Sequence, residues 1–268
     1  MTQYAQITDA QIITETRGGV AVVTMNRPQV MNALSSSLRR EMLAAVREAQ
    51  ASARVLVITG LGRAFCSGQD LNDASGQAGP LEALDFERIL SDEYEPLLTA
   101  LAESPIPTIA AVNGAAAGAG ANLALACDVV IATESAVFLQ AFTRIGLMPD
   151  AGGTWWLPRQ VGLARAMGAA LFAEPVSARQ AVDWGMIWEA VPDEDFVAHW
   201  QRRAEQLANG PTTAYRGVKQ AMRSSFGNDL GAQLALEARL QGQCGRTRDF
   251  AEGVGAFLGK RKPQFVGS

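Results

Sequence analysis

The chain has 268 residues, enough for one large domain, with 48% hydrophobic and 19% charged residues, as in ordinary soluble globular proteins. Its formal net charge of −4 excludes a general attraction to nucleic acid or to anionic membranes, so an anionic ligand needs local cationic groups. Three cysteines exclude a disulfide framework, and a single histidine excludes histidine-rich metal sites and most histidine-based triads. With no membrane-length apolar run and no signal-peptide pattern at the start, we expect a cytoplasmic protein.

Strand and helix patterns alternate in the first half of the chain. Apolar residues follow a helical period after Ser35, and the run at residues 55–59 is continuously apolar, as in buried strands. The expected elements are a β-hairpin of residues 12–17 and 20–25, a helix beginning at Ser35, a strand at 55–59, a loop at 60 to about 79 and a helix over about 81–103.

The alternation continues to about residue 192, after which the pattern is helical. We expect strands at 108–112, 128–132, 136–139 and 187–191, and helices at 118–126, 153–160, 162–172 and 177–184. Residues 193–258 read as helices interrupted at 210–211, 227–228 and 245. The sequence therefore predicts an α/β core with largely parallel strands over residues 1–192 and a helical region over 193–268, which we interpret as a separate layer or an oligomerisation region.

Two segments rich in small residues follow two of the expected strands, at residues 62–70 and 113–122. Ligands of open α/β sheets collect at strand ends, and glycine or alanine lets a ligand approach backbone N–H groups closely. Two such N–H groups, one of them at a helix start, would form an oxyanion hole. Close helix packing is an alternative explanation of the small residues, and a dinucleotide fingerprint fails because Leu123 occupies its last position.

Residues 145–155 hold one acidic side chain, Asp150, between an apolar turn and Gly152-Gly153, where a helix is expected to begin. A carboxylate with few polar neighbours has a raised pKa, which suits proton transfer near neutral pH. A structural role is the alternative, because an Asp that follows Pro149 just before a helix is a common N-cap. This segment alone leaves both interpretations open.

Other reactive side chains have weaker support. Ser67 lacks the glycine of a nucleophile elbow, since Phe65 stands in its place, and Cys66 is interpreted as a small packed residue. The basic run that begins at Lys260 is typical of a solvated tail, although it, Arg27 or Arg63 would also serve to hold a phosphate.

Several motifs in uninterrupted order resemble the enoyl-CoA hydratase/isomerase (crotonase) superfamily. They lie at residues 25–28, 32–34, 64–70, 110–114, 126–128 and 146–154. The resemblance implies a spiral of β-β-α turns, a helical trimerisation region and assembly as a trimer or a dimer of trimers. It also implies an acyl-CoA thioester whose carbonyl is held by two backbone N–H groups, which carry over to Ser67 and Ala119.

The resemblance implies further contacts with the acyl-CoA, and it separates hydratases from isomerases. The two glutamates of the hydratases would fall at Asn122 and Phe142, so water addition is disfavoured, whereas Asp150 falls where certain isomerases keep a single acid/base. The expected substrate-binding residues are Arg27, Ala64, Ser67, Gly68, Gln69, Asp70, Gly118, Asn122, Phe142 and Lys260.

Residues 141–150, 153–159, 184–188 and 257–265 are similar to one branch of the superfamily, the isomerases of ring-1,2-epoxyphenylacetyl-CoA. This similarity implies conversion to an oxepin-CoA, together with a shift of 3,4- to 2,3-enoyl-CoA double bonds, with no metal and no cofactor besides the coenzyme A of the substrate. Two alternatives stay open. Asp150 would act as a nucleophile in a hydrolase or dehalogenase-like enzyme, or the chain would be a non-catalytic CoA-binding member.

Overall fold

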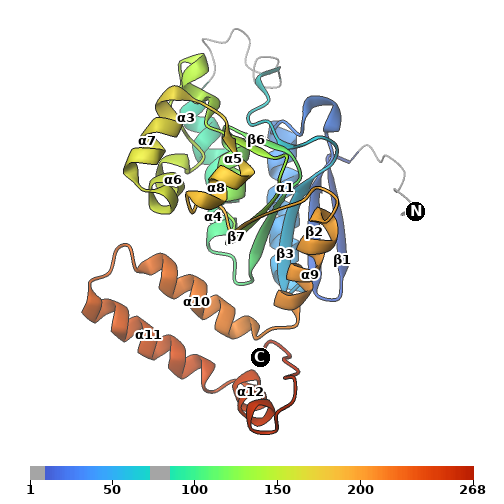
Figure 1. The fold of residues 1–268 in the computed structure, drawn as a ribbon, viewed down its shortest axis with the longest axis vertical. Coiled ribbons are helices and arrows are strands. Elements are labelled where there is room, and N and C mark those ends of the chain that lie inside the picture. The colour runs from blue at the N-terminus through green and yellow to red at the C-terminus, as the bar shows by residue number, and fades with distance from the viewer. Residues whose placement is uncertain (1–9, 73–84) are drawn as a thin grey trace.

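A six-stranded sheet forms the centre of the computed structural model, which describes residues 10–72 and 85–268 (Figure 1). Its first two strands are antiparallel, as the hairpin prediction requires, and all later pairs are parallel. The strand order is β1 (Ile12–Arg17), β2 (Val20–Met25), β3 (Val55–Gly60), β5 (Thr108–Val112), β7 (Val129–Thr133) and β10 (Glu189–Val191). The prediction of a largely parallel α/β core is thus confirmed.

A second, smaller sheet contains four short strands in the order β4 (Ala64–Cys66), β6 (Ala115–Ala117), β8 (Val137–Leu139) and β9 (Val176–Ser177). Three of them, β4, β6 and β9, were not predicted, because two or three residues are too few to show a period of two. The strands β3, β5 and β7 are each followed by a strand of this sheet and then by a helical segment. The chain therefore advances in β-β-α turns.

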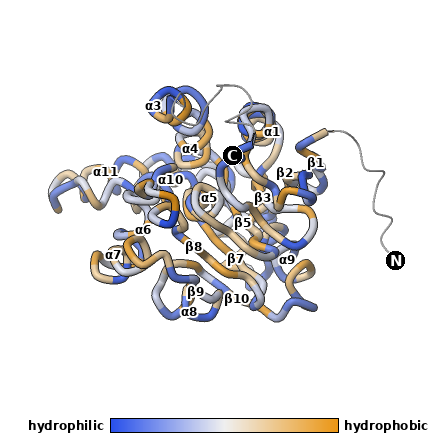
Figure 2. Tube along the Cα trace, turned by 90° about the horizontal axis from the view of Figure 1, so that it is seen from above, coloured by the Kyte–Doolittle hydropathy of each residue, from blue (hydrophilic) through white to orange (hydrophobic). Residues whose placement is uncertain are grey.

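Helix α1 (Ser36–Ser52) covers one face of the large sheet. The Ser35 hydroxyl accepts a hydrogen bond from the Leu38 N–H at 3.2 Å, so Ser35 is the N-cap that the sequence predicts. The apolar strands β5, β7 and β8 lie in the interior (Figure 2). Helix α1 buries a stripe of apolar residues with helical spacing against the large sheet. The stripe consists of Leu38, Met42, Ala45, Val46 and Ala49.

Helix α9 (Phe196–Ala208) covers the opposite face. Alternate strand residues such as Val57 and Ile109 meet Phe196 and Trp200 in a separate apolar cluster, because successive side chains of a strand point to opposite faces. By its packing α9 belongs to the α/β core, although the sequence assigns it to the helical region that begins at residue 193.

The remaining helices of the core lie between residues 86 and 183. They are α3 (Phe86–Ile89), a π-helical turn at Leu90–Tyr94, α4 (Glu95–Ala102), α5 (Ala119–Leu125), a 3-10 turn at Ala141–Ile145, α6 (Gly153–Val161), α7 (Leu163–Phe172) and α8 (Ala178–Asp183). The expected helix over 81–103 is confirmed from residue 86 onward, and residues 81–84 and the loop end at 73–79 lie outside the described residues.

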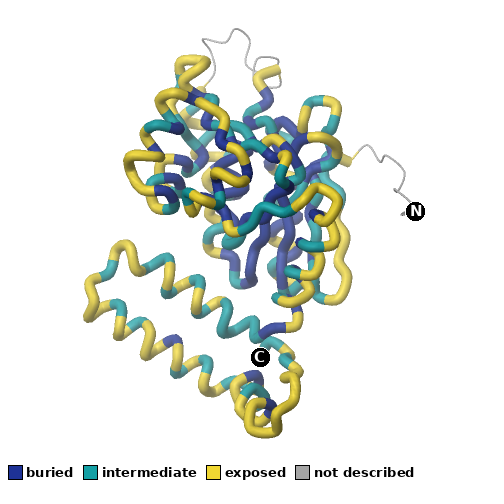
Figure 3. The backbone as a smooth tube through the Cα atoms, viewed as in Figure 1, coloured by how far each residue is buried: buried dark blue, intermediate teal, exposed yellow. Residues whose placement is uncertain are grey.

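Three C-terminal helices stand apart from the core (Figure 1). They are α10 (Thr212–Ser224), α11 (Leu230–Cys244) and α12 (Arg248–Leu258), and their breaks fall where the sequence predicts them. Asp128 anchors α10 to the core, since it pairs with Lys219 at 2.7 Å and Arg223 at 2.8 Å. Figure 3 shows that α11 and α12 are mostly exposed, whereas α10 is mostly of intermediate burial. Several large apolar side chains in this region are exposed. Within the described part of the chain, no helix is long and apolar enough to cross a membrane.

Candidate active site

An apolar cavity of about 280 Å³ lies where the smaller sheet meets α5 and the segment after β8. It brings together residues from four separate parts of the sequence, three of which the strand-end and Asp150 predictions include. The predicted site residues that line it are Ser67, Gly68, Gln69, Gly118, Ala119, Phe142 and Asp150.

One wall of the cavity was not predicted as part of the site. Phe86, Ile89, Leu90 and Tyr94 contribute it from α3 and the π-helical turn, and Arg144 adds the cationic side chain of the lining. Their spacing of three and four residues is the available sequence signal, but it indicates a helix face and does not say what the face covers.

Gly68 allows two backbone segments to approach each other at the cavity. Its φ of +97° is in the region that favours glycine, and a Cβ there would lie 2.9 Å from the Ala117 carbonyl oxygen and 3.5 Å from the Ala119 nitrogen. The loop after β4 therefore runs directly beside the start of α5. Ala119 is the first residue of that helix, so its N–H has no acceptor within the helix.

The second N–H group of the predicted oxyanion hole has to be reassigned. The Ser67 N–H donates to the Met31 carbonyl at 3.0 Å and is therefore already satisfied. Two residues further on, the Gln69 N–H has no acceptor among the described residues. The residues on either side of Gln69 are both bonded to Leu34: the Gly68 carbonyl accepts the Leu34 N–H at 2.7 Å, and the Asp70 N–H donates to the Leu34 carbonyl at 3.2 Å. Gln69 and Ala119, both in the cavity lining, thus offer two N–H groups for which the described part of the chain supplies no acceptor, as an oxyanion hole requires.

Asp150 is the acidic side chain that lines the cavity among the described residues. One carboxylate oxygen, Oδ1, is buried and has no hydrogen-bond partner within the described residues. Burial raises the pKa of Asp150 from 3.8 to about 6. The helix N-cap is Gly152, which lies two residues later, so the cap interpretation of Asp150 is wrong. The carboxyl group is free to take and return a proton near neutral pH.

The raised pKa of Asp150 predicts a pH-dependent stability difference for Asp150→Asn. Because the folded pKa lies above the unfolded one, the folded wild type loses stability as pH rises from about 4 to about 6. We expect the variant to be more stable by about 1–2 kcal/mol at pH 8, allowing for partial exposure of the group. Urea unfolding of both proteins between pH 4 and pH 8 measures it. A stability difference that does not change with pH would contradict the raised pKa.

Asn122 holds the loop that carries Asp150. The side chain is completely buried and outside the cavity lining, and its Nδ2 donates to the Asp150 carbonyl at 2.8 Å. Gln140 in turn donates to Asn122 Oδ1 at 2.8 Å, and the Gly153 N–H donates to the same Asp150 carbonyl. The expected substrate contact of Asn122 is therefore replaced by a positioning contact, since both ends of the amide are bonded within the protein.

Phe142 occupies the other position where a hydratase would have a glutamate. Its ring lies over Gly118, where an added Cβ would meet Phe142 Cζ at 3.6 Å. The side chain is mostly buried and forms part of the cavity wall beside Ala119. An apolar ring here offers no acceptor that would orient a water molecule.

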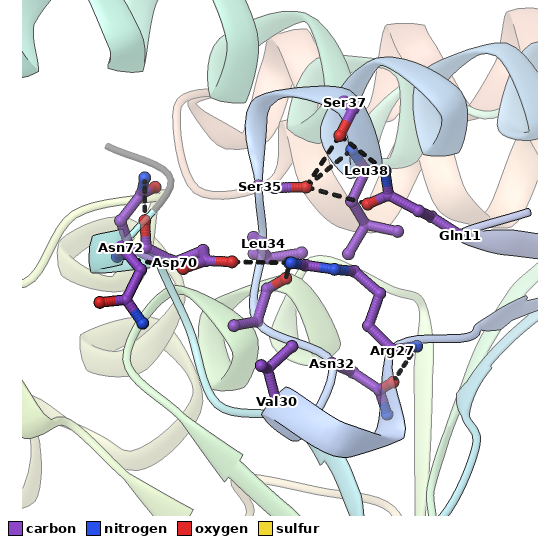
Figure 4. A network of polar contacts seen from close by, with 12 residues as sticks. Gln11, Arg27, Val30, Asn32, Leu34, Ser35, Ser37, Leu38, Asp70 and Asn72 are labelled. Carbon is purple, nitrogen blue, oxygen red and sulfur yellow. Dashed lines mark hydrogen bonds and ion pairs between the residues drawn. The ribbon is translucent and has the colours of Figure 1, made fainter. Parts of the chain in front are cut away.

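Four other expected substrate-binding residues lie outside the cavity lining. Arg27 Nη1 pairs with Asp70 Oδ2 at 2.8 Å and donates to the Ala33 carbonyl at 2.6 Å (Figure 4). The Ala64 carbonyl accepts from Asn32 at 2.8 Å within the buried backbone of β4. Lys260 is exposed and follows α12. In the single chain, Arg27 and Ala64 therefore bond to the turn that leads into α1, and Lys260 lies apart from the cavity.

Other reactive groups do not compete with Asp150. Burial raises the pKa of the Cys66 thiol to about 12, which agrees with its interpretation as a packed residue. His199 lies in α9, where Nε2 is 2.5 Å from Glu189 Oε2, and it serves the structural role that the sequence predicts. Among residues 10–72 and 85–268, no group of three or more His, Cys, Asp or Glu residues is placed to hold a metal ion.

The family model described as enoyl-CoA hydratase/isomerase matches residues 15–268 of this chain. The chain belongs to the enoyl-CoA hydratase/isomerase family. The family resemblance of the sequence motifs is thereby confirmed, and the family's acyl-CoA chemistry is consistent with the cavity described above.

Relatives in this family have different names. A protein of Rhodobacter capsulatus named "Probable enoyl-CoA hydratase" is 62% identical over 249 residues, 93% of this chain and 95% of that protein. The 1,2-epoxyphenylacetyl-CoA isomerase of Escherichia coli is 46% identical over 259 residues, 96% of this chain and 98% of that enzyme. An enoyl-CoA hydratase structure from Bacillus anthracis matches with a TM-score of 0.89 at 31% identity, over 97% of this chain and all of that one. The family and fold are shown, whereas the choice between isomerase and hydratase depends on the site.

Proposed function

We propose that this enzyme is an acyl-CoA isomerase that converts ring-1,2-epoxyphenylacetyl-CoA to oxepin-CoA by proton transfer through Asp150. The observation that carries the proposal is that Asp150 is the only acidic side chain in the cavity lining among the described residues. Hydration requires one group to activate water and another to protonate carbon, and the corresponding positions hold Asn122 and Phe142. The 46% identity to an enzyme with the name of this activity supports the proposal.

The proposed reaction moves one proton and leaves the formula of the substrate unchanged. Asp150 takes a proton from the carbon next to the thioester, and the electron pair left behind forms a thioester enolate. The ring epoxide opens to its seven-membered oxepin form by breaking the carbon–carbon bond that the epoxide bridges. The protonated Asp150 then returns the proton to a ring carbon, which leaves a double bond conjugated with the thioester. The same proton transfer would shift a 3,4-double bond of an enoyl-CoA into conjugation.

The enolate oxygen would be held by the N–H groups of Gln69 and Ala119. These donors would bind the charge that develops on that oxygen in the transition state, and a largely apolar cavity strengthens such hydrogen bonds. Phe142 and the wall of Phe86, Ile89 and Leu90 would surround the ring of the substrate. The reaction is redox-neutral, so it requires no cofactor apart from the coenzyme A that the substrate carries.

Self-association is part of the proposal. Helices α11 and α12 expose Leu230, Phe250 and Phe257, and the loop before α11 exposes Phe226. An open apolar groove lies between α10, α11 and α12. Exposed apolar surface on this scale is typical of interfaces. We expect trimers or dimers of trimers to cover it, and we expect Arg27 or Lys260 to contact coenzyme A phosphates in the assembled enzyme.

Conversion of two thioesters tests the function directly. Purified protein is incubated with ring-epoxidised phenylacetyl-CoA and, separately, with a cis-3-enoyl-CoA, in water labelled with heavy oxygen. We expect products of the same mass as the substrates, with a conjugated double bond and no heavy oxygen, detected by mass spectrometry and ultraviolet absorbance. A trans-2-enoyl-CoA serves as the hydration control and is expected to stay unchanged.

Each alternative has its own outcome in this experiment. Addition of one water molecule to the trans-2-enoyl-CoA would show a hydratase, the activity in the name of the 62% identical relative. Release of heavy-oxygen-labelled acid or alcohol would show a hydrolase or dehalogenase-like enzyme. Binding without conversion of any of the thioesters would show a non-catalytic member. Any of these results would contradict the proposal.

A further inference from the structure

A buried arginine on α1 is bonded to Gln69 behind the cavity wall. The Arg39 side chain is only 2% exposed, and its Nη1 donates to Gln69 Oε1 at 2.8 Å. The Tyr94 hydroxyl, from the π-helical turn, donates to the same oxygen at 2.6 Å. Two donors from separate elements therefore fix the side chain of the residue whose backbone N–H is free in the cavity.

All three guanidinium nitrogens of Arg39 donate hydrogen bonds. Its Nε and Nη2 donate to Glu93 Oε2 at 3.1 and 2.6 Å, and its guanidinium lies 4.6 Å from the centre of the Tyr94 ring. Nη1 also donates at 2.6 Å to the Leu34 carbonyl, which accepts the Asp70 N–H as well. The arginine thus contacts Gln69 through its side chain and, through Leu34, the backbone that follows it.

Burying an ion pair such as Arg39 and Glu93 costs free energy unless every charged group has its hydrogen-bond partners. Well-packed apolar side chains in place of a buried ion pair often stabilise a fold equally well or better. Glu93 supplies the charge that neutralises Arg39, and the Leu34 carbonyl already accepts from Nη1. The fork of the guanidinium instead links α1, the π-helical turn and residues 34 and 69 into one rigid unit.

We propose that Arg39 and Tyr94 are positioning residues that aim the Gln69 N–H at the thioester oxygen of the substrate. The inference rests on the proposed function, because it assumes that Gln69 and Ala119 bind that oxygen. Arg39 does not line the cavity, so its effect has to pass through Gln69. Tyr94 lines the cavity and acts from the other side of the same amide oxygen.

The test uses phenylacetyl-CoA with an isotope label at the carbonyl carbon. This unreactive analogue exchanges its α-protons in deuterium oxide if the enzyme forms the enolate, and infrared difference spectra report hydrogen bonding to its carbonyl. For Arg39→Lys, Arg39→Met and Tyr94→Phe we expect proton exchange to slow by about 10–100-fold, as for a misplaced oxyanion donor. The carbonyl band should move towards its position in water, while the Kd changes by less than about threefold. Arg39→Lys should retain more activity than Arg39→Met.

Lys219→Met is the matched control. Lys219 belongs to another mostly buried ion pair, with Asp128 at 2.7 Å, and it lies outside the cavity. We expect it to lower the melting temperature without changing the carbonyl band or the exchange rate. If the Arg39 and Tyr94 variants behave like this control, the network is merely structural and the inference is overturned. A wild type that shows neither exchange nor a band shift would overturn the proposed function, and this inference with it.

Discussion

Replacing Asp150 with asparagine is expected to lower kcat for double-bond isomerisation by about 10³-fold, within the range for loss of a general base. Asparagine keeps the size of the side chain but cannot take a proton. Acyl-CoA binding should change by less than about threefold, since in the proposed site backbone N–H groups and apolar walls hold the thioester. Steady-state kinetics with a cis-3-enoyl-CoA and calorimetric titration with its saturated analogue measure the two effects.

The pH dependence links this loss to the Asp150 carboxylate. In the wild type, kcat/KM should rise with pH to a plateau above the pKa of about 6, because the base has to be ionised in the free enzyme. The residual activity of Asp150→Asn should lack this rise. Asp195→Asn, an exposed change at the start of α9, is the control and should leave both rate and profile unchanged. Retention of wild-type isomerisation by Asp150→Asn would contradict the assignment.

Gly120→Ala is expected to destabilise the fold by about 3 kcal/mol and to abolish measurable isomerisation. Gly120 is buried at the start of α5, and a Cβ there would lie 2.4 Å from the Cys66 carbonyl oxygen and 2.7 Å from its Sγ. The obstacle is the backbone of β4, which cannot move without disturbing its pairing with β6. The resulting shift of α5 would displace the Ala119 N–H from the loop that carries Gln69.

Gly168→Ala provides the matched control for this glycine. Gly168 lies inside α7, where an added Cβ meets no atom within 4 Å. Alanine is the better helix former, so we expect an unchanged or slightly higher stability, by up to about 1 kcal/mol, and full activity. Urea unfolding and kinetics of both variants test the pair. Equal stability of the two variants would contradict the close packing of α5 against β4.

The long periodic elements were predictable from the sequence. The hairpin of β1 and β2, the start of α1 at its Ser35 cap and the breaks between α9, α10, α11 and α12 all follow local rules of periodicity and capping. The smaller sheet was not predictable in the same way. Its strands have two or three residues each, and they are strands only because neighbouring chain segments supply their hydrogen-bond partners.

The candidate site also has a part that the sequence predicts and a part that depends on the fold. Asp150 stands out in the sequence as an isolated carboxylate, and its apolar surroundings indicate a raised pKa. The sequence does not show which N–H groups are free. The Ser67 N–H, for example, is satisfied by the carbonyl of Met31, which lies 36 positions earlier in the sequence. The bond of Asn122 to the Asp150 carbonyl likewise joins residues that lie 28 positions apart.

The sequence by itself determined the family, the order of the main elements and the acidic group with which the chemistry is expected to work. These properties depend on residue types and short spacings, and the amino-acid sequence contains both. Only the tertiary structure decided that Gln69 rather than Ser67 has the free N–H, that Asn122 positions Asp150, and that Arg39 lies behind Gln69. Each of these depends on which distant group satisfies a given donor or acceptor, and that pairing exists only once the chain has folded.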